Sequence, residues 1–278
     1  KNIGITGSID VYQKETKDML LRLNIPDFMG FDDPDQNTGK MITKGWDDVL
    51  DDYVLTANIS APGITVLEVQ AKGINDFTGI EDFVKLQILH CEENNISNIN
   101  LNNLTELRQL YCWDNELSSI DLTQNTALTL LACYGNNLTN LDLSQNVDLT
   151  MVSCSNNVLQ SINLDGASAL ESLLCDRNEI VSLDLSANIA LKTLNCQYNQ
   201  LVSLNVRNGH NELITSFNAR NNPTLSCIEV DDSTKANNME APYLYWSKDP
   251  ASAYSENCVH PTTFIPDNNF EQALIDLG

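Results

Sequence analysis

Residues 128–148 read LTLLACYGNNLTNLDLSQNVD, and this stretch decides the fold. Its apolar residues and its first inward asparagine follow the pattern L-x-x-L-x-C-x-x-N-x-L-x-x-L-x-L. Cysteines at the same place in the pattern recur every 21 residues: they are Cys91, Cys112, Cys133, Cys154, Cys175 and Cys196. A fixed period of this length is the signature of a protein built from stacked repeats.

Two further columns keep this period. They are Leu86, Leu107, Leu128, Leu149, Leu170 and Leu191, and Asn94, Asn115, Asn136, Asn157, Asn178 and Asn199. A degenerate unit at 64–77 precedes these six units and another, with an insertion, follows at 217–230, which predicts about eight coils. Because one unit buries almost no surface alone, we expect neighbouring units to stack their short strands about 4.8 Å apart into a parallel sheet.

The unit resembles the leucine-rich repeat, with cysteine at the third apolar position. The resemblance implies an α/β repeat solenoid: a leucine-rich-repeat horseshoe with a parallel β-sheet as its concave face, a helical N-terminal cap and a C-terminal cap. We expect a partly helical N-terminal cap at 1–63, the solenoid at 64–226 with regular repeats from 86 to 206, and the C-terminal cap at 227–258. Residues 259–278 are predicted to hold a linker and the start of a following repeat domain.

The eight cysteines fall into two groups. Six share the inward-facing column, where we expect free thiols that act as small apolar side chains; zinc needs sulfurs that converge in a tetrahedron, whereas a column spreads them along a line. Cys227 and Cys258 bracket a segment without the repeat pattern, and we expect a disulfide between them that closes the C-terminal cap. Closing a loop of about thirty residues contributes roughly 3–4 kcal/mol in the chain-entropy model, and a disulfide indicates an oxidising compartment, hence a secreted or surface protein.

The asparagine of each unit comes where the strand ends. We expect its amide to turn inward and to satisfy backbone groups that the tight bend would leave unpaired in the core, so that its role is structural. A second polar column, on the convex side, is interpreted as a solvated face. Its members are Asn100, Asp121, Asp142, Asn163, Asp184 and Asn205.

Three stretches resemble the leucine-rich-repeat surface proteins of Bacteroidetes-type bacteria, which are related in plan to internalins. These stretches are DVLDDYVLTANIS at 48–60 with GIEDF at 79–83, the repeats themselves, and LSCIEVDD at 225–232 with YSENC at 254–258. The resemblance implies secretion and display at a cell surface. Residues 265–278 look like the opening of another repeat domain, so neighbouring tandem repeat domains are expected partners, whereas 1–45 depart from the short helix usual in that group.

Charge and motifs exclude several classes of function. The formal net charge of -23, from 38 acidic and 15 basic residues, repels phosphate backbones and anionic lipid, so we expect no nucleic-acid partner. No run of about eighteen apolar residues occurs, so direct membrane insertion is not expected. The histidines His90, His210 and His260 lie in separate parts of the chain, and no hydrolase, phosphate-loop or zinc-protease motif is present, so we expect a protein that is not an enzyme and needs no cofactor.

Side chains that flank the buried residues of each strand face outward on the concave wall, where repeats are free to differ. Tyr111, Trp113 and Tyr134 fall there on adjacent coils, and nothing in the repeat requires rings at these positions. Rings of this kind supply contact area at low entropy cost. The predicted ligand-binding residues are His90, Glu92, Tyr111, Trp113, Asp114, Leu130, Tyr134, Met151, Arg177 and Tyr198.

These residues favour an extracellular binding or adhesion module that recognises a protein or a glycan at a cell surface. The alternative is a structural spacer or docking unit within a long tandem-repeat surface protein, in which the rings only protect the sheet. Truncating the rings separates the two hypotheses, because a binder loses affinity and a spacer loses nothing.

Two weaker motifs lie outside the repeats. Asp33, Asp35 and Asn37 offer oxygen ligands at alternate positions, as calcium loops do, although the EF-hand positions for Gly and Glu hold Thr38 and Lys44; the alternative is a solvated acidic loop. Ser233 lies in Asp-Ser-Thr at 232–234, which resembles the short O-glycosylation motif of these bacteria.

Overall fold

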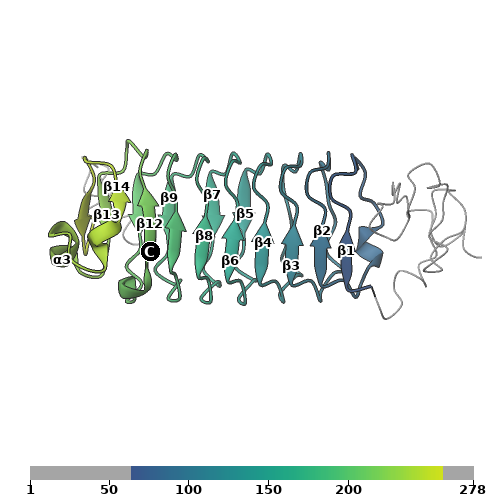
Figure 1. Cartoon of the computed structure of the whole chain (residues 1–278), viewed down its shortest axis with the longest axis horizontal. Helices are drawn as coiled ribbons and strands as arrows, with labels where there is room; N and C mark the ends of the chain where they lie inside the picture. Colours follow the sequence, from purple (N-terminus) through teal and green to yellow (C-terminus); the bar gives the residue numbers. More distant parts are fainter. Residues whose placement is uncertain (1–63, 259–278) are drawn as a thin grey trace, which may run out of the picture.

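The computed structural model describes residues 64–258, which form a solenoid of parallel strands. One strand from each coil enters a nine-stranded sheet that runs across Figure 1 from β1 on the right to β14 on the left. In spatial order its strands are β1 (Val66–Glu68), β2 (Ile88–His90), β3 (Gln109–Tyr111), β4 (Leu130–Ala132), β6 (Met151–Ser153), β8 (Ser172–Leu174), β10 (Thr193–Asn195), β12 (Ser216–Ala219) and β14 (Ser247–Lys248). Leu131 lies in register with Leu110 on one side and Val152 on the other, so the sequence period becomes the strand register.

The return arms of the coils are extended. They form a two-stranded sheet of β5 (Asn140–Asp142) and β7 (Ser161–Asn163), and a four-stranded sheet of β9 (Ser182–Asp184), β11 (Ser203–Asn205), β13 (Cys227–Glu229) and β15 (Ala253–Ser255). Helical structure within 64–258 is limited to α3 (Ser233–Asn237) and the 3-10 turns η4 (Ile80–Asp82), η5 (Asn211–Leu213) and η6 (Tyr243–Tyr245). An extended arm advances about 3.3 Å per residue against 1.5 Å for a helix, so a short unit closes its coil with fewer residues.

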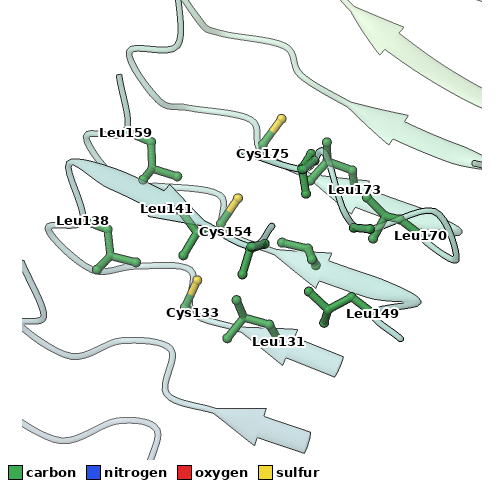
Figure 2. Close-up of a cluster of buried hydrophobic side chains, with 14 of the residues drawn as sticks. Leu131, Cys133, Leu138, Leu141, Leu149, Cys154, Leu159, Leu170, Leu173 and Cys175 are labelled. Carbon is green, nitrogen blue, oxygen red and sulfur yellow. The ribbon is translucent and has the colours of Figure 1, made fainter. Parts of the chain in front are cut away.

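The core lies between the two strand layers and consists of the predicted leucine and cysteine columns. Figure 2 shows Cys133, Cys154 and Cys175 stacked along the solenoid beside leucines from both layers. All six cysteines of this column are buried free thiols. Burial raises the pKa of Cys133 to about 12, so the thiol is neutral and packs as a small apolar group.

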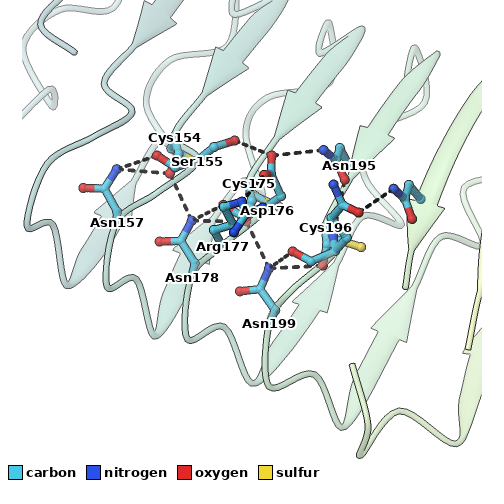
Figure 3. A network of polar contacts seen from close by, with 12 residues as sticks. Cys154, Ser155, Asn157, Cys175, Asp176, Arg177, Asn178, Asn195, Cys196 and Asn199 are labelled. Atoms are coloured by element: carbon cyan, nitrogen blue, oxygen red, sulfur yellow. Dashed lines mark hydrogen bonds and ion pairs between the residues drawn. The ribbon is translucent and has the colours of Figure 1, made fainter. Parts of the chain in front are cut away.

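The predicted role of the asparagine column is confirmed. Asn178 shows the pattern: its Nδ2 donates to the carbonyls of Cys154 at 3.0 Å and Cys175 at 3.1 Å, and its Oδ1 accepts from the backbone N–H of Leu159 at 3.0 Å. The Asn157 and Asn199 amides repeat these contacts in the adjacent coils (Figure 3). Each amide therefore ties the bend of one coil to the coil before it.

A second buried asparagine column was not anticipated. Asn125, Asn146 and Asn188 are fully buried where the return arm turns back, and Leu104 and Ala167 occupy the same column. Their Nδ2 atoms donate to backbone carbonyls of the preceding coil, but their Oδ1 atoms have no hydrogen-bond partner. The 21-residue spacing of Asn125 and Asn146 is the signal in the sequence that locates this column.

The convex polar column does more than face solvent. Each of its six members accepts a hydrogen bond on Oδ1 from the backbone N–H two residues later, as Asp121 does from Thr123 at 3.0 Å. Short polar side chains favour such turns because they replace a backbone acceptor. The interpretation as a purely solvated face is therefore incomplete, since these residues also close the turn that follows.

The C-terminal cap is joined by the expected disulfide. Cys227, at the start of β13, is bonded to Cys258, with their Cα atoms 5.8 Å apart. Although the segment between them lacks the repeat pattern, β14 and β15 extend both strand layers. Trp246 stacks on Phe217 of the preceding coil, with ring centroids 4.2 Å apart, and so covers the end of the core.

Several predicted features lie outside residues 64–258, among them the helical N-terminal cap, the acidic loop with Asp33, Asp35 and Asn37, and the start of a following domain. Ser233 is described: it is the first residue of α3, and its hydroxyl donates to Glu256 at 3.2 Å. Its glycosylation stays a prediction. Across the described range no helix has the length and apolar character needed to cross a membrane.

Candidate binding face

The outward side of the nine-stranded sheet, here called the strand face, carries the predicted site. Side chains alternate along each strand, so in β3 Leu110 is buried while Gln109 and Tyr111 are half-buried and reach the surface. The backbone continues the parallel ladder past the strand ends, as Asp114 N donates to the Tyr134 carbonyl at 2.9 Å. Equivalent positions of successive coils therefore stand side by side.

Four rings gather on the strand face over the first coils and form two stacked pairs. The rings of His90 and Tyr111 lie 4.2 Å apart, centroid to centroid, with planes 4° apart. Those of Trp113 and Tyr134 lie 5.1 Å apart with planes 7° apart. All four are half-buried, and we call this group the aromatic platform. Because each pair joins equivalent positions of neighbouring coils, the parallel register places the two residues of each pair side by side.

Glu92 lies beside the platform, in the same column as Trp113 of the next coil. Its Oε1 is 3.0 Å from His90 Nδ1, yet the residue is only 7% exposed and its Oε2 is buried without a hydrogen-bond partner. In the coil before, Gln70 also has a buried side-chain oxygen without a partner. Burial, followed by the charges of Asp114 and Glu92, raises the pKa of Tyr134 above its usual value. This end of the strand face is rich in acceptors and short of donors.

Further along the strand face the polar groups satisfy one another. Asp176 Oδ1 accepts from the Ser155 hydroxyl at 2.6 Å and from Asn195 Nδ2 at 3.0 Å, as Figure 3 shows. Arg177 Nε lies 3.9 Å from Asp176 Oδ2, and its guanidinium carbon stands 4.7 Å from the centre of the Tyr198 ring. We call these residues the polar network; its carboxylate has donors within the chain.

No family model and no curated protein matches the sequence. Solved structures do match: an internalin, InlF, from Listeria monocytogenes superposes with a TM-score of 0.54 at 22% sequence identity, over 74% of this chain and 66% of that one. The fold is that of leucine-rich-repeat proteins. A Listeria monocytogenes structure described as the functional domain of InlJ, which includes a cysteine ladder, is 25% identical with a TM-score of 0.38, over 73% of this chain and 57% of that chain.

A leucine-rich-repeat protein from Leptospira interrogans is also similar, at 20% identity and a TM-score of 0.43, over 63% of this chain and 52% of that chain. The chain thus spans between about half and two thirds of the length of these three proteins. They come from Listeria and Leptospira, and the resemblance to Bacteroidetes-type surface proteins stays a prediction.

The leucine-rich-repeat geometry divides the predicted site into two groups. Leu130, on the same coil as Tyr134, and Met151, on the next coil, are register partners on β4 and β6, and Met151 is 41% exposed. Arg177 and Tyr198 instead pair with each other in the polar network. Arg177 lies two coils after Tyr134, a separation of roughly 10 Å at strand spacing. The ten predicted residues therefore do not form one cluster.

One column of the strand face, which follows the column of Glu92, Trp113 and Tyr134, is conformationally restricted. The non-glycine residues there have positive φ: they are Ala71 at 55°, Glu93 at 56°, Asp114 at 50°, Asn156 at 53°, Arg177 at 56°, Tyr198 at 55° and Asn221 at 60°. In the fourth coil Gly135 takes this position, with φ 67°. The residues in this column differ from coil to coil, and the left-handed backbone narrows the choice among them, because it penalises side chains, β-branched ones most.

Within 64–258 no group of three or more His, Cys, Asp or Glu side chains is placed to hold a metal ion. The residues predicted to bind calcium lie in the N-terminal segment, outside this range. The strand face carries ring surfaces, the carboxylates of Glu92 and Asp176 and amide groups.

Proposed function

We propose that the chain is an extracellular module that binds a protein ligand through the aromatic platform. The observation that carries the proposal is the pair of ring stacks, His90 with Tyr111 and Trp113 with Tyr134, at positions where the repeat needs no ring. Stacked rings that are half-buried offer a firm apolar surface whose polar edges still reach water. Aromatic side chains are enriched among the residues that dominate binding energy in protein interfaces.

Two further features support this proposal. The rings gather at one end of the strand face, whereas the polar network satisfies its own hydrogen bonds and offers less to a partner. The disulfide between Cys227 and Cys258 is typical of proteins that fold in an oxidising compartment, which favours an extracellular location. A structural spacer would require the solenoid but neither of the ring stacks.

The test uses the whole chain against panels of purified extracellular proteins and of polysaccharides, each with and without calcium. The Trp113→Ala/Tyr134→Ala variant is compared with Tyr198→Ala, which removes a ring of the same face outside the platform. We expect saturable binding to a protein that the double variant weakens by about thirtyfold or more, as loss of a dominant contact does, and that Tyr198→Ala changes by less than about twofold. Thermal unfolding establishes that each variant is folded.

Binding only to a polysaccharide would overturn the protein ligand, and equal losses in the two variants would overturn the platform as its site. Absence of binding across both panels would favour the spacer. Calcium dependence would point to the N-terminal acidic loop as a contributor.

A further inference from the structure

Glu92 and Asp176 occupy the same column of the strand face, four repeats apart. Both are acidic, and both have a ring nearby. Trp113 follows Glu92 in the same column, whereas the ring of Tyr198 lies under the guanidinium of Arg177, the residue after Asp176. The repeat therefore places a carboxylate at the same position twice, with rings nearby that lie in different columns, and the groups around the two copies can be compared.

The Asp176 copy is complete. Ser155, one coil earlier in the same column, donates to Oδ1, and so does Asn195 of the coil after. Arg177 supplies the positive charge near Oδ2 and covers the ring of Tyr198. A carboxylate, a cation and an aromatic face are thus brought together within the chain.

The Glu92 copy lacks its donors. The position of Asn195 is taken by Tyr111, whose hydroxyl donates to Gln109 at 3.2 Å, and the position of Arg177 is taken by Glu93. Gln70 replaces Ser155 and has a buried oxygen of its own without a partner. His90 contacts Oε1 only, so Oε2 stays buried without a donor, which is an unfavourable state for a carboxylate oxygen.

We propose that Glu92 accepts a lysine or arginine side chain of the protein ligand, which lies against the Trp113 and Tyr134 rings, and that a change of the Glu92 rotamer on binding brings the buried Oε2 to this cation. The inference rests on the proposed function and names the chemical group that the platform recognises. The cation replaces the arginine that the Asp176 copy carries internally, and ring faces next to a carboxylate attract a cation. The formal charge of the chain, -23, favours the approach of a basic ligand.

The experiment titrates the whole chain with four blocked tetrapeptides, Gly-Gly-X-Gly, in which X is lysine, arginine, glutamate or uncharged norleucine. The indole N–H signal of Trp113 in a ¹H–¹⁵N spectrum reports binding, assigned with Trp113→Phe, at about 0.15 M salt to screen long-range attraction. Glu92→Gln removes the charge with little change in shape, and Asp176→Asn is the matched control in the same column.

We expect the lysine and arginine peptides, and neither of the others, to shift the Trp113 signal. Glu92→Gln should weaken this binding by about tenfold or more, as removal of one partner of a desolvated charge pair does, and Asp176→Asn by less than about twofold. An absence of shift with both basic peptides, or equal weakening in the two variants, would overturn the inference. Thermal unfolding of both variants separates these results from a loss of folding.

The same variants separate this inference from the proposed function. A protein ligand that loses affinity in Trp113→Ala/Tyr134→Ala but binds Glu92→Gln normally would leave the platform as the binding site and refute the cation anchor. A basic peptide that binds at Glu92 while no protein of the panel binds would support the anchor and refute the proposed function for that panel.

Discussion

Replacing Asn136 by alanine tests the asparagine column against a matched control, Asn146→Ala. Both residues belong to one repeat, both are buried, and both changes remove the same atoms. Asn136 accepts from the backbone N–H of Leu117 at 2.9 Å and donates to two carbonyls at 2.9 and 3.0 Å. Asn146 donates to two carbonyls at 3.1 and 2.9 Å, and its Oδ1 has no partner.

The cost of each substitution in free energy of unfolding depends on which buried backbone groups lose their hydrogen-bond partners. Without Asn136 the buried N–H of Leu117 loses its acceptor, which costs about 1–3 kcal/mol, and two carbonyl bonds worth about 1 kcal/mol each are lost. We therefore expect Asn136→Ala to lower the free energy of unfolding by about 3–5 kcal/mol. In Asn146→Ala the two carbonyls keep their backbone donors, and an unsatisfied buried oxygen disappears, so the expected loss is about 0–1 kcal/mol. Ala167 already occupies that column in the next coil.

The assay is equilibrium unfolding in urea, followed by circular dichroism, with amide hydrogen exchange at Leu117 as the local probe. The difference of about 3 kcal/mol corresponds to a midpoint lower by about 6–12 °C in thermal unfolding of a domain of this size. Exchange at Leu117 should accelerate in Asn136→Ala and stay protected in Asn146→Ala. Equal destabilisation by the two variants, within about 1 kcal/mol, would refute the reasoning, because deletion of a buried side chain would then account for the whole effect.

Three further predictions concern the disulfide, the left-handed turn and the buried phenols. Cys227→Ser should lower the free energy of unfolding by about 3–4 kcal/mol, and a reductant should have the same effect on the unaltered chain. Cys133 and its column should resist a thiol reagent at pH 8 until the chain unfolds, because burial raises the Cys133 pKa to about 12. Rapid labelling of the native chain would contradict this. Asn156→Val should be less stable than Asn156→Gly by about 1–2 kcal/mol in urea unfolding, because φ is 53° there, and equal stabilities would show that the turn tolerates β-branching. Burial raises the pKa of Tyr243 and Tyr254 to about 12, above the ordinary 10.0, so as the pH rises the unfolded chain releases these protons before the folded chain does. The free energy of unfolding should therefore hold below pH 10 and fall between about pH 10 and 12, which the urea midpoint and phenolate absorbance measure. A midpoint that stays constant would argue against burial of the two phenols.

Much of the candidate site follows from the period, but its internal relations do not. The register predicts that Tyr111, Trp113 and Tyr134 lie on neighbouring coils, and the structure places them there. It does not predict which rings stack, that Tyr111 turns its hydroxyl to Gln109, or that one oxygen of Glu92 has no donor. Those outcomes depend on side-chain rotamers and on the residues that flank each position in the coils before and after.

The sequence by itself determined the solenoid, the inward leucine, cysteine and asparagine columns and the Cys227–Cys258 pairing, because each of these recurs at a fixed spacing or is left over from it. Only the tertiary structure decided that the return arms are extended, that the C-terminal cap adds to both strand layers, and that the column of Asn156 has a left-handed backbone. It also decided that Asp176 is satisfied while Glu92 is not. The physical reason is that a repeat pattern specifies which side chains face the core, whereas hydrogen-bond partners and backbone conformation arise from contacts between coils.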